Sequence, residues 1–306
     1  MVEPGQRRRV DIPVARLPTG AWTSIPIEVI RGFNAGPTCW LSGAIHGDEI
    51  DGVEIIRQIS QALDPTKVRG TVIAVPIVNG FGFVAESRFL PDGRDLNRAF
   101  PGSKRGSLAS RLAGLFMREV VDHCDYGIDF HCGSDDRINL PQLRADLSDD
   151  ETLALARAFG APVALHSKPP KGSLRTAAVR LGKKVLVYEG GEAKRFTAEA
   201  IHAGVTGSFR LMKALRMLDH AEAVTEDVAV CRKSRWVRAA RSGICRLDAE
   251  LGGVVKKGEA LGVISDAFGD PQATVKARVD GVVVGRRLNP LVNQGDALVH
   301  IGVVET

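Results

Sequence analysis

Cysteine, tyrosine and long apolar runs are scarce in this chain of 306 residues, and each scarcity excludes a class of protein. The five cysteines form no C-x-x-C pair and leave an odd count, which indicates reduced thiols in a cytoplasmic protein. The longest apolar runs, such as 185–188, are far shorter than the ~20 residues that a membrane-spanning helix needs. The first 14 residues contain arginines but no apolar core, so we expect neither a signal peptide nor a membrane partner.

Positive charge is also too sparse to indicate a nucleic-acid partner. The formal net charge is +5, and the obvious basic cluster, Arg7 to Arg9, runs directly into a strand-like alternation. Such a cluster is typical of a solvated strand end. With 44% hydrophobic and 25% charged residues, the chain has the composition of an ordinary globular protein, and its length suits about two domains.

Hydrophobic periodicity predicts strands that alternate with helices over the first two thirds of the chain. Runs that are apolar on nearly every residue predict buried strands at 38–45, 70–78, 126–130 and 183–188. Apolar residues at helical spacing predict helices at 53–63, 108–121, 153–159 and 198–218. This order indicates an α/β fold, and the strand–helix–strand unit at 38–78 predicts a parallel pair of strands.

The carboxyl-terminal part differs from the rest of the chain in composition and in hydrophobic pattern. After Leu218 the chain is dense in valine and glycine and shows no convincing helical pattern. We therefore expect two domains, an α/β domain at 1–225 and a small all-β domain at 226–306.

Two copies of roughly forty residues make up this tail, each with a glycine turn followed by a G-[ED]-A-L string. The pattern resembles the biotinyl/lipoyl barrel-sandwich module. Such modules carry a modified lysine between the two copies, where this chain has Asp270 and Pro271, and Lys276 lies too close to Gly281. The resemblance therefore implies a structural domain without a carrier lysine.

A histidine and a carboxylate follow the first apolar strand at a spacing that suits a metal. His46 and Glu49 lie three residues apart beyond the strand at 38–45, and His131 follows the strand at 126–130. Carboxyl ends of parallel strands meet at one edge of a sheet. Two histidines and one glutamate form a ligand set of catalytic zinc, with a fourth position left open.

Each of these residues has a structural alternative when it is taken alone. H-x-x-E arises easily by chance, and His131 could be a core histidine bonded to a carbonyl group. Asp129, two residues before His131, is expected either to orient a ligand or the helix below, or to be a surface or capping aspartate. The conjunction of the two strand ends favours one Zn²⁺ per chain.

A polar loop at 86–102 lies between the ligand-bearing strands and shows no periodicity. It is either an exposed turn or a binding loop. Arg98 beside Asn97 can hold a substrate carboxylate by charge-assisted hydrogen bonds, and Arg88 could lie over a developing oxyanion. The alternative for each arginine is a solvated side chain.

The motifs H-G-D-E, D-L-N-R, D-F-H and E-G-G follow one another in this order over about the first 220 residues. In this the chain resembles the succinylglutamate desuccinylase/aspartoacylase family of the zinc carboxypeptidase superfamily. The longer string P-D-G-R-D-L-N-R-x-F-P-G and the β tail are similar to its bacterial aspartoacylase-like branch. The resemblance implies a zinc-carboxypeptidase-like α/β fold, with a mixed, largely parallel sheet flanked by helices, and hydrolysis of an amide bond.

The resemblance also implies roles for individual residues. The implied zinc ligands are His46, Glu49 and His131, and the implied carboxylate contacts are Asn97 and Arg98. Glu189 would be the general base, and Arg88 would support the oxyanion. Because the loop before D-L-N-R is longer here, Arg94 is a rival for Arg88. Arg175 is a candidate for a further carboxylate contact, with a surface arginine as the alternative.

The substrate implied is a small N-acyl amino acid of the N-acetyl or N-succinyl class, such as N-acetyldiaminobutyrate or N-acetylaspartate. The superfamily often closes its site with a tyrosine, but the chain has only Tyr126 and Tyr188, both before the tail. Another group must therefore close the site. The alternatives are a zinc carboxypeptidase acting on short peptides and a non-catalytic zinc-stabilised scaffold. A homo-oligomer formed through the β tail is a further possibility.

Overall fold

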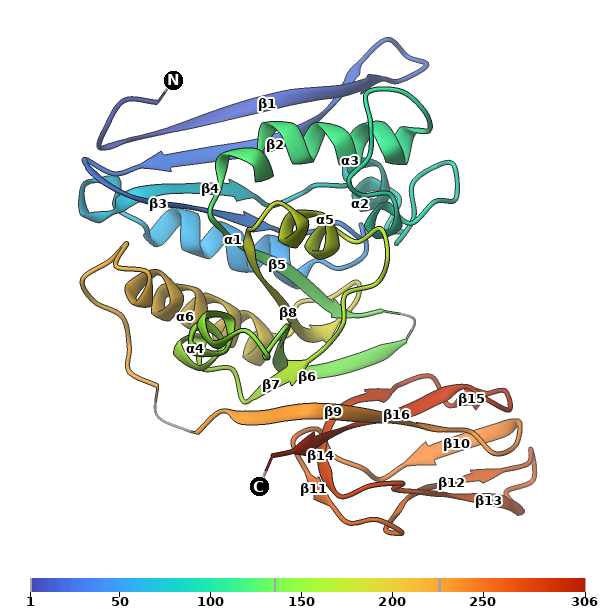
Figure 1. The fold of residues 1–306 in the computed structure, drawn as a ribbon. Coiled ribbons are helices and arrows are strands. Elements are labelled where there is room, and N and C mark those ends of the chain that lie inside the picture. Colours follow the sequence, from blue (N-terminus) through green and yellow to red (C-terminus); the bar gives the residue numbers. More distant parts are fainter. Residues whose placement is uncertain (1, 135, 225–226, 306) are drawn as a thin grey trace.

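The computed structural model describes residues 2–134, 136–224 and 227–305, in which a helix-flanked sheet continues into an all-β unit (Figure 1). The strands before residue 200 are β1 (Gln6–Arg16), β2 (Trp22–Arg31), β3 (Asn34–Ser42), β4 (Arg69–Val75), β5 (Tyr126–Gly133), β6 (Arg137–Ala145), β7 (Val163–His166) and β8 (Lys184–Glu192). The helices are α1 (Asp51–Ala62), α2 (Gly80–Val84), α3 (Leu108–Glu119), α4 (Asp150–Phe159), α5 (Leu174–Arg180) and α6 (Ala198–Ala214). Short 3-10 turns occupy Pro65–Lys67, Leu96–Arg98 and Val121–His123.

The remaining strands are β9 (Ala229–Arg238), β10 (Gly243–Leu247), β11 (Val254–Val255), β12 (Ala260–Ser265), β13 (Pro271–Lys276), β14 (Gly281–Arg287), β15 (Leu291–Val292) and β16 (Ala297–Val304). Within the described ranges, the large sheet has the order β1-β2-β4-β3-β5-β8-β6-β7-β9-β16-β14-β11. Its centre, β4-β3-β5-β8, is parallel, and β6 runs antiparallel to β8. The fold is therefore mixed α/β, and the carboxyl ends of β3, β5 and β8 meet at one edge.

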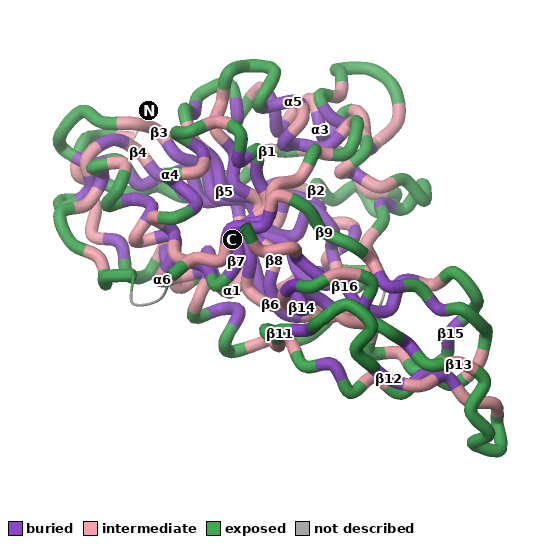
Figure 2. The backbone as a smooth tube through the Cα atoms, turned by 60° about the horizontal axis from the view of Figure 1, so that its bottom comes forward, coloured by how far each residue is buried: buried purple, intermediate pink, exposed green. Residues whose placement is uncertain are grey.

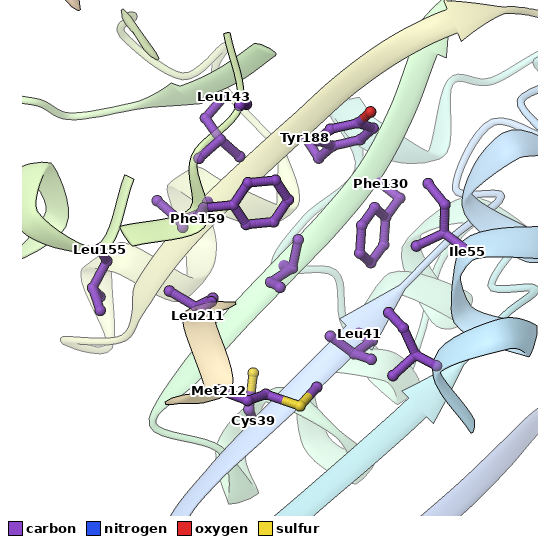
Figure 3. Close-up of a cluster of buried hydrophobic side chains, with 14 of the residues drawn as sticks. Cys39, Leu41, Ile55, Phe130, Leu143, Leu155, Phe159, Tyr188, Leu211 and Met212 are labelled. Carbon is purple, nitrogen blue, oxygen red and sulfur yellow. The ribbon is translucent and has the colours of Figure 1, made fainter. Parts of the chain in front are cut away.

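Apolar side chains cover both faces of the central strands. One core cluster joins them to α1, α4 and α6, and the other joins them to α3 and α5. In the first cluster, the ring of Tyr188 of β8 packs at a tilt against the rings of Phe130 of β5 and Phe159 of α4 (Figure 3). β5 is buried at every position after Tyr126. This burial holds the end of β5, where His131 lies, within a close-packed frame.

The all-β unit packs against the main sheet along two strands. β9 pairs with β7 in parallel, and β14 pairs antiparallel with the first residues of β6. The unit also has its own apolar core, built from residues such as Val237, Leu261 and Ile301. Figure 2 shows this unit extending away from the central sheet, and its outer strand β13 is exposed at most positions. The large sheet thus runs across the sequence boundary expected at residue 225.

Most of the expected elements are present, with shifted ends. The strand expected at 70–78 stops at Val75 before Pro76, and the last long helix stops at Ala214 instead of 218. β6, β7 and α5 were not expected from the sequence. Pro141 and a register shift interrupt the alternation of β6, and α5 is only 7 residues long, so neither gives a sustained periodic signal. None of the described helices combines the length and apolarity that crossing a membrane would require.

Candidate functional site

The loop after β3 carries His46 and Glu49 to the carboxyl edge of the sheet. Ala44, fully buried, adopts a left-handed backbone conformation with a φ of 47°, which turns the chain sharply before His46. Gly47 packs so closely on the backbone of α2 that a Cβ there would lie 1.9 Å from the carbonyl carbon of Gly82. Glu49 then lies just ahead of α1. The close backbone contacts fix both side chains before any ligand binds.

The side chains of His46, Glu49 and His131 direct nitrogen and oxygen atoms to one point. We expected this proximity from their positions near the ends of two parallel strands. His46 Nδ1 lies 2.8 Å from Glu49 Oε1, and His131 Nδ1 lies 2.7 Å from Glu49 Oε2. Ligand atoms of all three residues lie within 4.8 Å of one another, and all three side chains are buried. Buried nitrogen and oxygen donors that converge in this way can hold a divalent ion.

Each histidine has a carboxylate partner on its other ring nitrogen. His46 Nε2 lies 3.2 Å from Asp95 Oδ1, and His131 Nε2 lies 3.0 Å from Asp129 Oδ2. Asp129 is buried and also accepts a hydrogen bond from Ser42, so its surface alternative is wrong. Metal-binding histidines commonly have such carboxylate partners, which fix the ring tautomer and orientation.

The pKa values of the three candidate ligands follow from their mutual pairing. Burial disfavours a charged ring, but the Glu49 and Asp95 carboxylates raise the pKa of His46 above its usual value. The pKa of His131 is raised well above its usual value, since Asp129 and Glu49 outweigh the same burial effect. Burial also opposes ionisation of Glu49, yet the two histidines lower its pKa. The site therefore strongly favours a positive charge between its donors, either protons or a metal ion.

Of the two arginines proposed for the oxyanion, only Arg88 reaches the donor cluster. Its NH1 group lies 3.3 Å from both His46 Nδ1 and Glu49 Oε1, and its NH2 group donates to Asp95 Oδ2 at 3.0 Å. Arg94 is exposed and pairs with Asp92 at 2.8 Å. The geometry therefore separates Arg94 from the cluster.

Glu189 lies on β8, next to His131 in the pairing of β5 with β8. Arg144 donates to its Oε1 atom at 3.0 Å, and Asn139 donates to its Oε2 atom at 2.8 Å. Only 14% of its side chain is exposed. Both partners come from β6, so their contact with Glu189 could not be read from the sequence motifs.

A cavity of about 290 Å³ joins the donor cluster to Glu189. Its lining contains several positively charged side chains, among them Arg98, Lys168 and Arg175. Asn97 Oδ1 accepts a hydrogen bond from the backbone of Leu174 at 2.9 Å, which draws Asn97 and Arg98 toward α5 and Arg175. Its Nδ2 group is left as a donor for a ligand.

Arg175 is buried, with 6% exposed, so the surface alternative is wrong. Its NH2 group donates to Ser167 at 2.7 and 3.0 Å, whereas its buried NH1 group has no hydrogen-bond partner in the described part of the chain. Burial, with the charge of Arg144 nearby, lowers its pKa to about 10. A buried guanidinium with an unpartnered group beside a cavity is a ready partner for an anion.

An aromatic wall from the all-β unit closes another side of the cavity. Trp236 of β9 stacks on the buried ring of His300, with centroids 4.4 Å apart and an interplanar angle of 6°. The guanidinium of Arg137 lies 5.5 Å from the Trp236 centroid. Both Trp236 and Arg137 line the cavity. In contrast, Tyr188, the residue before Glu189 in the chain, is buried in the core and donates to the carbonyl group of Ala200.

Sequence reasoning missed five of these contributors: Asp95, Arg137, Asn139, Arg144 and Trp236. Asp95 belongs to the D-L-N-R string, and its place before a turn could have suggested a buried partner. Arg137, Asn139 and Arg144 lie on β6, where a short alternation of polar and apolar residues was the available signal, and Trp236 lies on β9.

The chain matches the family model described as the succinylglutamate desuccinylase/aspartoacylase catalytic domain over residues 35–215. Among curated proteins, it is 30% identical over 300 residues to an N-alpha-acetyl-L-2,4-diaminobutyric acid deacetylase of Halomonas elongata. The alignment covers 93% of this chain and 87% of that protein.

Solved structures show the same likeness over almost the whole chain. A succinylglutamate desuccinylase/aspartoacylase from Rhodobacter sphaeroides superposes with a TM-score of 0.88 at 28% identity, covering 98% of this chain and 96% of the other. The product-bound ectoine utilization protein EutE (DoeB) of Ruegeria pomeroyi gives a TM-score of 0.89 at 26% identity, covering 99% and 97%.

Proposed function

Because the chain belongs to the succinylglutamate desuccinylase/aspartoacylase family, we propose that it is a zinc-dependent deacylase of a small N-acyl amino acid. The deacetylase, desuccinylase and aspartoacylase names of its relatives identify it as a hydrolase that acts on non-peptide amide bonds. The observation that carries the zinc-dependent mechanism is the convergence of His46, Glu49 and His131 at one end of the cavity that also contains Glu189. The products would be a carboxylic acid and a free amino acid.

The donor set fits one zinc ion. Two imidazole nitrogens and a carboxylate are ligands that zinc accepts in catalytic sites, and Asp95 and Asp129 are in place to orient the two rings. His46, Glu49 and His131 would hold the ion. Zinc bound there would supply a Lewis acid that makes water nucleophilic near neutral pH.

The side chains around this position have distinct tasks in the proposed reaction. Glu189 takes a proton from the attacking water and returns it to the leaving amine, as a general base and then a general acid. Arg88 faces the donor cluster and stabilises negative charge that develops on the acyl oxygen. Trp236, which lines the cavity, would limit the entry of bulk water.

Asn97, Arg98 and Arg175 meet near the start of α5, and we assign to them the carboxylate of the substrate. The carboxylates Glu49, Asp129 and Glu189 of the cavity lining are already engaged by histidine, serine, asparagine or arginine. The excess charge at this end is therefore positive, and it favours a substrate with at least one carboxylate. An N-acetyl or N-succinyl amino acid satisfies this requirement, including N-acetyldiaminobutyrate and N-acetylaspartate.

We further propose that residues 226–306 form a domain of their own with a barrel-sandwich arrangement. Its separate apolar core and the four-stranded sheet β13-β12-β10-β15 support this division. The domain would contribute to the reaction through Trp236, whose ring would close one side of the cavity over the substrate.

A substrate screen tests the proposed function directly. The zinc-loaded protein would be incubated with N-acetyl and N-succinyl derivatives of acidic, neutral and diamino acids, and with short unblocked peptides, and amine release would be measured. We expect turnover of at least one N-acyl amino acid and much slower cleavage of the peptides. Preferential peptide cleavage would identify a carboxypeptidase, and one bound zinc without any hydrolysis would identify a scaffold.

Replacement of Arg175 should weaken substrate binding. For Arg175→Leu we expect KM to rise by about 10- to 100-fold while kcat changes by only a few fold, as for the loss of one hydrogen bond to a charged group. Steady-state kinetics on the best substrate of the screen measures both constants. Arg180→Leu, an exposed position on the same helix, is the matched control and should behave as wild type. An unchanged KM for Arg175→Leu would show that Arg175 has only a structural role.

Replacement of Arg88 should affect turnover more than binding. We expect kcat of Arg88→Leu to fall by about 10²- to 10³-fold, the usual effect of removing one oxyanion donor. Arg94→Leu, in the same loop but exposed, should stay within about twofold of wild type, since exposed substitutions rarely matter. Equal losses for both variants would contradict the separation of their roles.

A further inference from the structure

The carboxylate of Glu189 is held by two side chains of β6, one on each oxygen. Asn139 Nδ2 donates to Oε2 at 2.8 Å, and Arg144 NH1 donates to Oε1 at 3.0 Å. Asn139 is buried, with 6% exposed. A base that must reach its proton at hydrogen-bond distance benefits from such a clamp, because a displacement of about 1 Å can cost about 10²-fold in rate.

Asn139 also belongs to one of the two strand pairs through which the all-β unit joins the catalytic sheet. On one edge of β6 it pairs with Gly191 of β8, and on the other edge it pairs with Gly285 of β14. β7 takes over that second edge only from Gln142 onward. Gln142 itself donates to the carbonyl group of Val284 at 2.8 Å, which adds a further contact between β6 and β14.

Because Gly285 has no side chain, the amide group of Asn139 can occupy the space next to it. A Cβ atom at position 285 would lie 2.7 Å from Asn139 Oδ1, closer than side chains tolerate. The backbone of Gly285 is not in the left-handed region, so alanine could be accommodated there without backbone strain. An added methyl group would instead push on the amide that donates to Glu189.

We infer that Asn139 is a positioning residue for Glu189 and that β14 of the all-β unit sets its orientation through Gly285. The inference rests on the proposed role of Glu189 as the base. It gives the carboxyl-terminal unit a part in turnover besides the wall formed by Trp236. Asn139 acts through Glu189, so its effect belongs in kcat and not in substrate binding.

A double-mutant cycle tests the inference. For Asn139→Ala and for Gly285→Ala we expect kcat to fall by about 10- to 100-fold, with KM within about threefold and one zinc per chain retained. The double variant should be no slower than Asn139→Ala alone, because the added methyl group then has no amide to displace. Wild-type kcat for Gly285→Ala, or a double variant whose loss is the product of the two single losses, would overturn the inference.

Gly302→Ala is the matched control. Gly302 lies in β16 of the same unit, and a Cβ there would meet Cys231 Sγ at 2.9 Å and not Asn139. It should keep the wild-type kcat. A loss equal to that of Gly285→Ala would show that general loosening of the unit is responsible, which would overturn the inference.

Failure of the proposed function would be visible separately, as a wild-type protein that hydrolyses no N-acyl amino acid or a fully active Glu189→Gln. Crystal structures of wild type and Gly285→Ala then test the geometry without turnover. We expect the variant to have lost the contact between Asn139 Nδ2 and Glu189. An intact contact at its wild-type distance would overturn the part assigned to Gly285.

Discussion

Glu189→Gln should abolish nearly all turnover while the protein keeps its zinc. Loss of a general base typically lowers the rate by about 10²- to 10⁴-fold, and we expect a value toward the upper end because Glu189 serves both proton transfers. Glutamine fills the same space next to Asn139 and Arg144, so the fold should persist. The measurements are kcat on the best substrate, zinc per chain and the melting temperature.

The control for this variant is Glu192→Gln. Glu192 lies on the same strand, β8, but its carboxylate forms an ion pair with Arg195, whose side chain is exposed. It should keep wild-type activity to within a few fold. Full activity in Glu189→Gln would transfer the base role to another group and would remove the mechanism proposed above.

Removal of a candidate metal ligand should lower activity about as much as Glu189→Gln does. Unlike Glu189→Gln, it should also lower the amount of bound zinc. For His131→Ala we expect bound zinc to fall well below one per chain after dialysis against a weak chelator, and hydrolysis to fall by at least about 10³-fold. The reason is that two protein ligands remain where three are needed for a stable site with an open position. Metal analysis by mass spectrometry and kinetics with added zinc measure both quantities.

Cys132 provides the matched control, because its thiol is the neighbouring group that could rival a histidine as a ligand. Burial, together with the charge of Glu49, raises the pKa of this thiol well above its usual value, which disfavours the thiolate that binds metal. Cys132→Ala should therefore retain one zinc and most of its activity. Zinc loss in Cys132→Ala equal to that in His131→Ala would assign a ligand role to the thiol.

The ligand set could be predicted from the sequence because each member is placed by local structure. His46 and Glu49 follow one buried strand and His131 follows another, so a parallel sheet brings them together without further information. Glu189 was identified through the family resemblance, and it lies near the end of a third parallel strand, β8. The roles of these residues remain predictions, but their proximity is a direct result of the fold.

Neighbours that come from irregular or short elements could not be predicted. Arg175 lies on α5, which has too few residues for a periodic signal, so its burial was not expected. The choice between Arg88 and Arg94 depended on how one aperiodic loop folds over the donor cluster. No spacing rule describes such a loop.

The sequence by itself determined the α/β class, the positions of the candidate metal ligands and the all-β character of the tail. Each of these depends on patterns among residues that are near one another in the chain, such as the alternation of side chains along a strand. Only the tertiary structure decided what surrounds the candidate base. Asn139 and Arg144 reach Glu189 because β6 runs antiparallel to β8, and Gly285 reaches Asn139 because β14 pairs with β6. Pairing between strands so distant in the chain is chosen by the packing of the whole sheet, and local sequence patterns do not encode it.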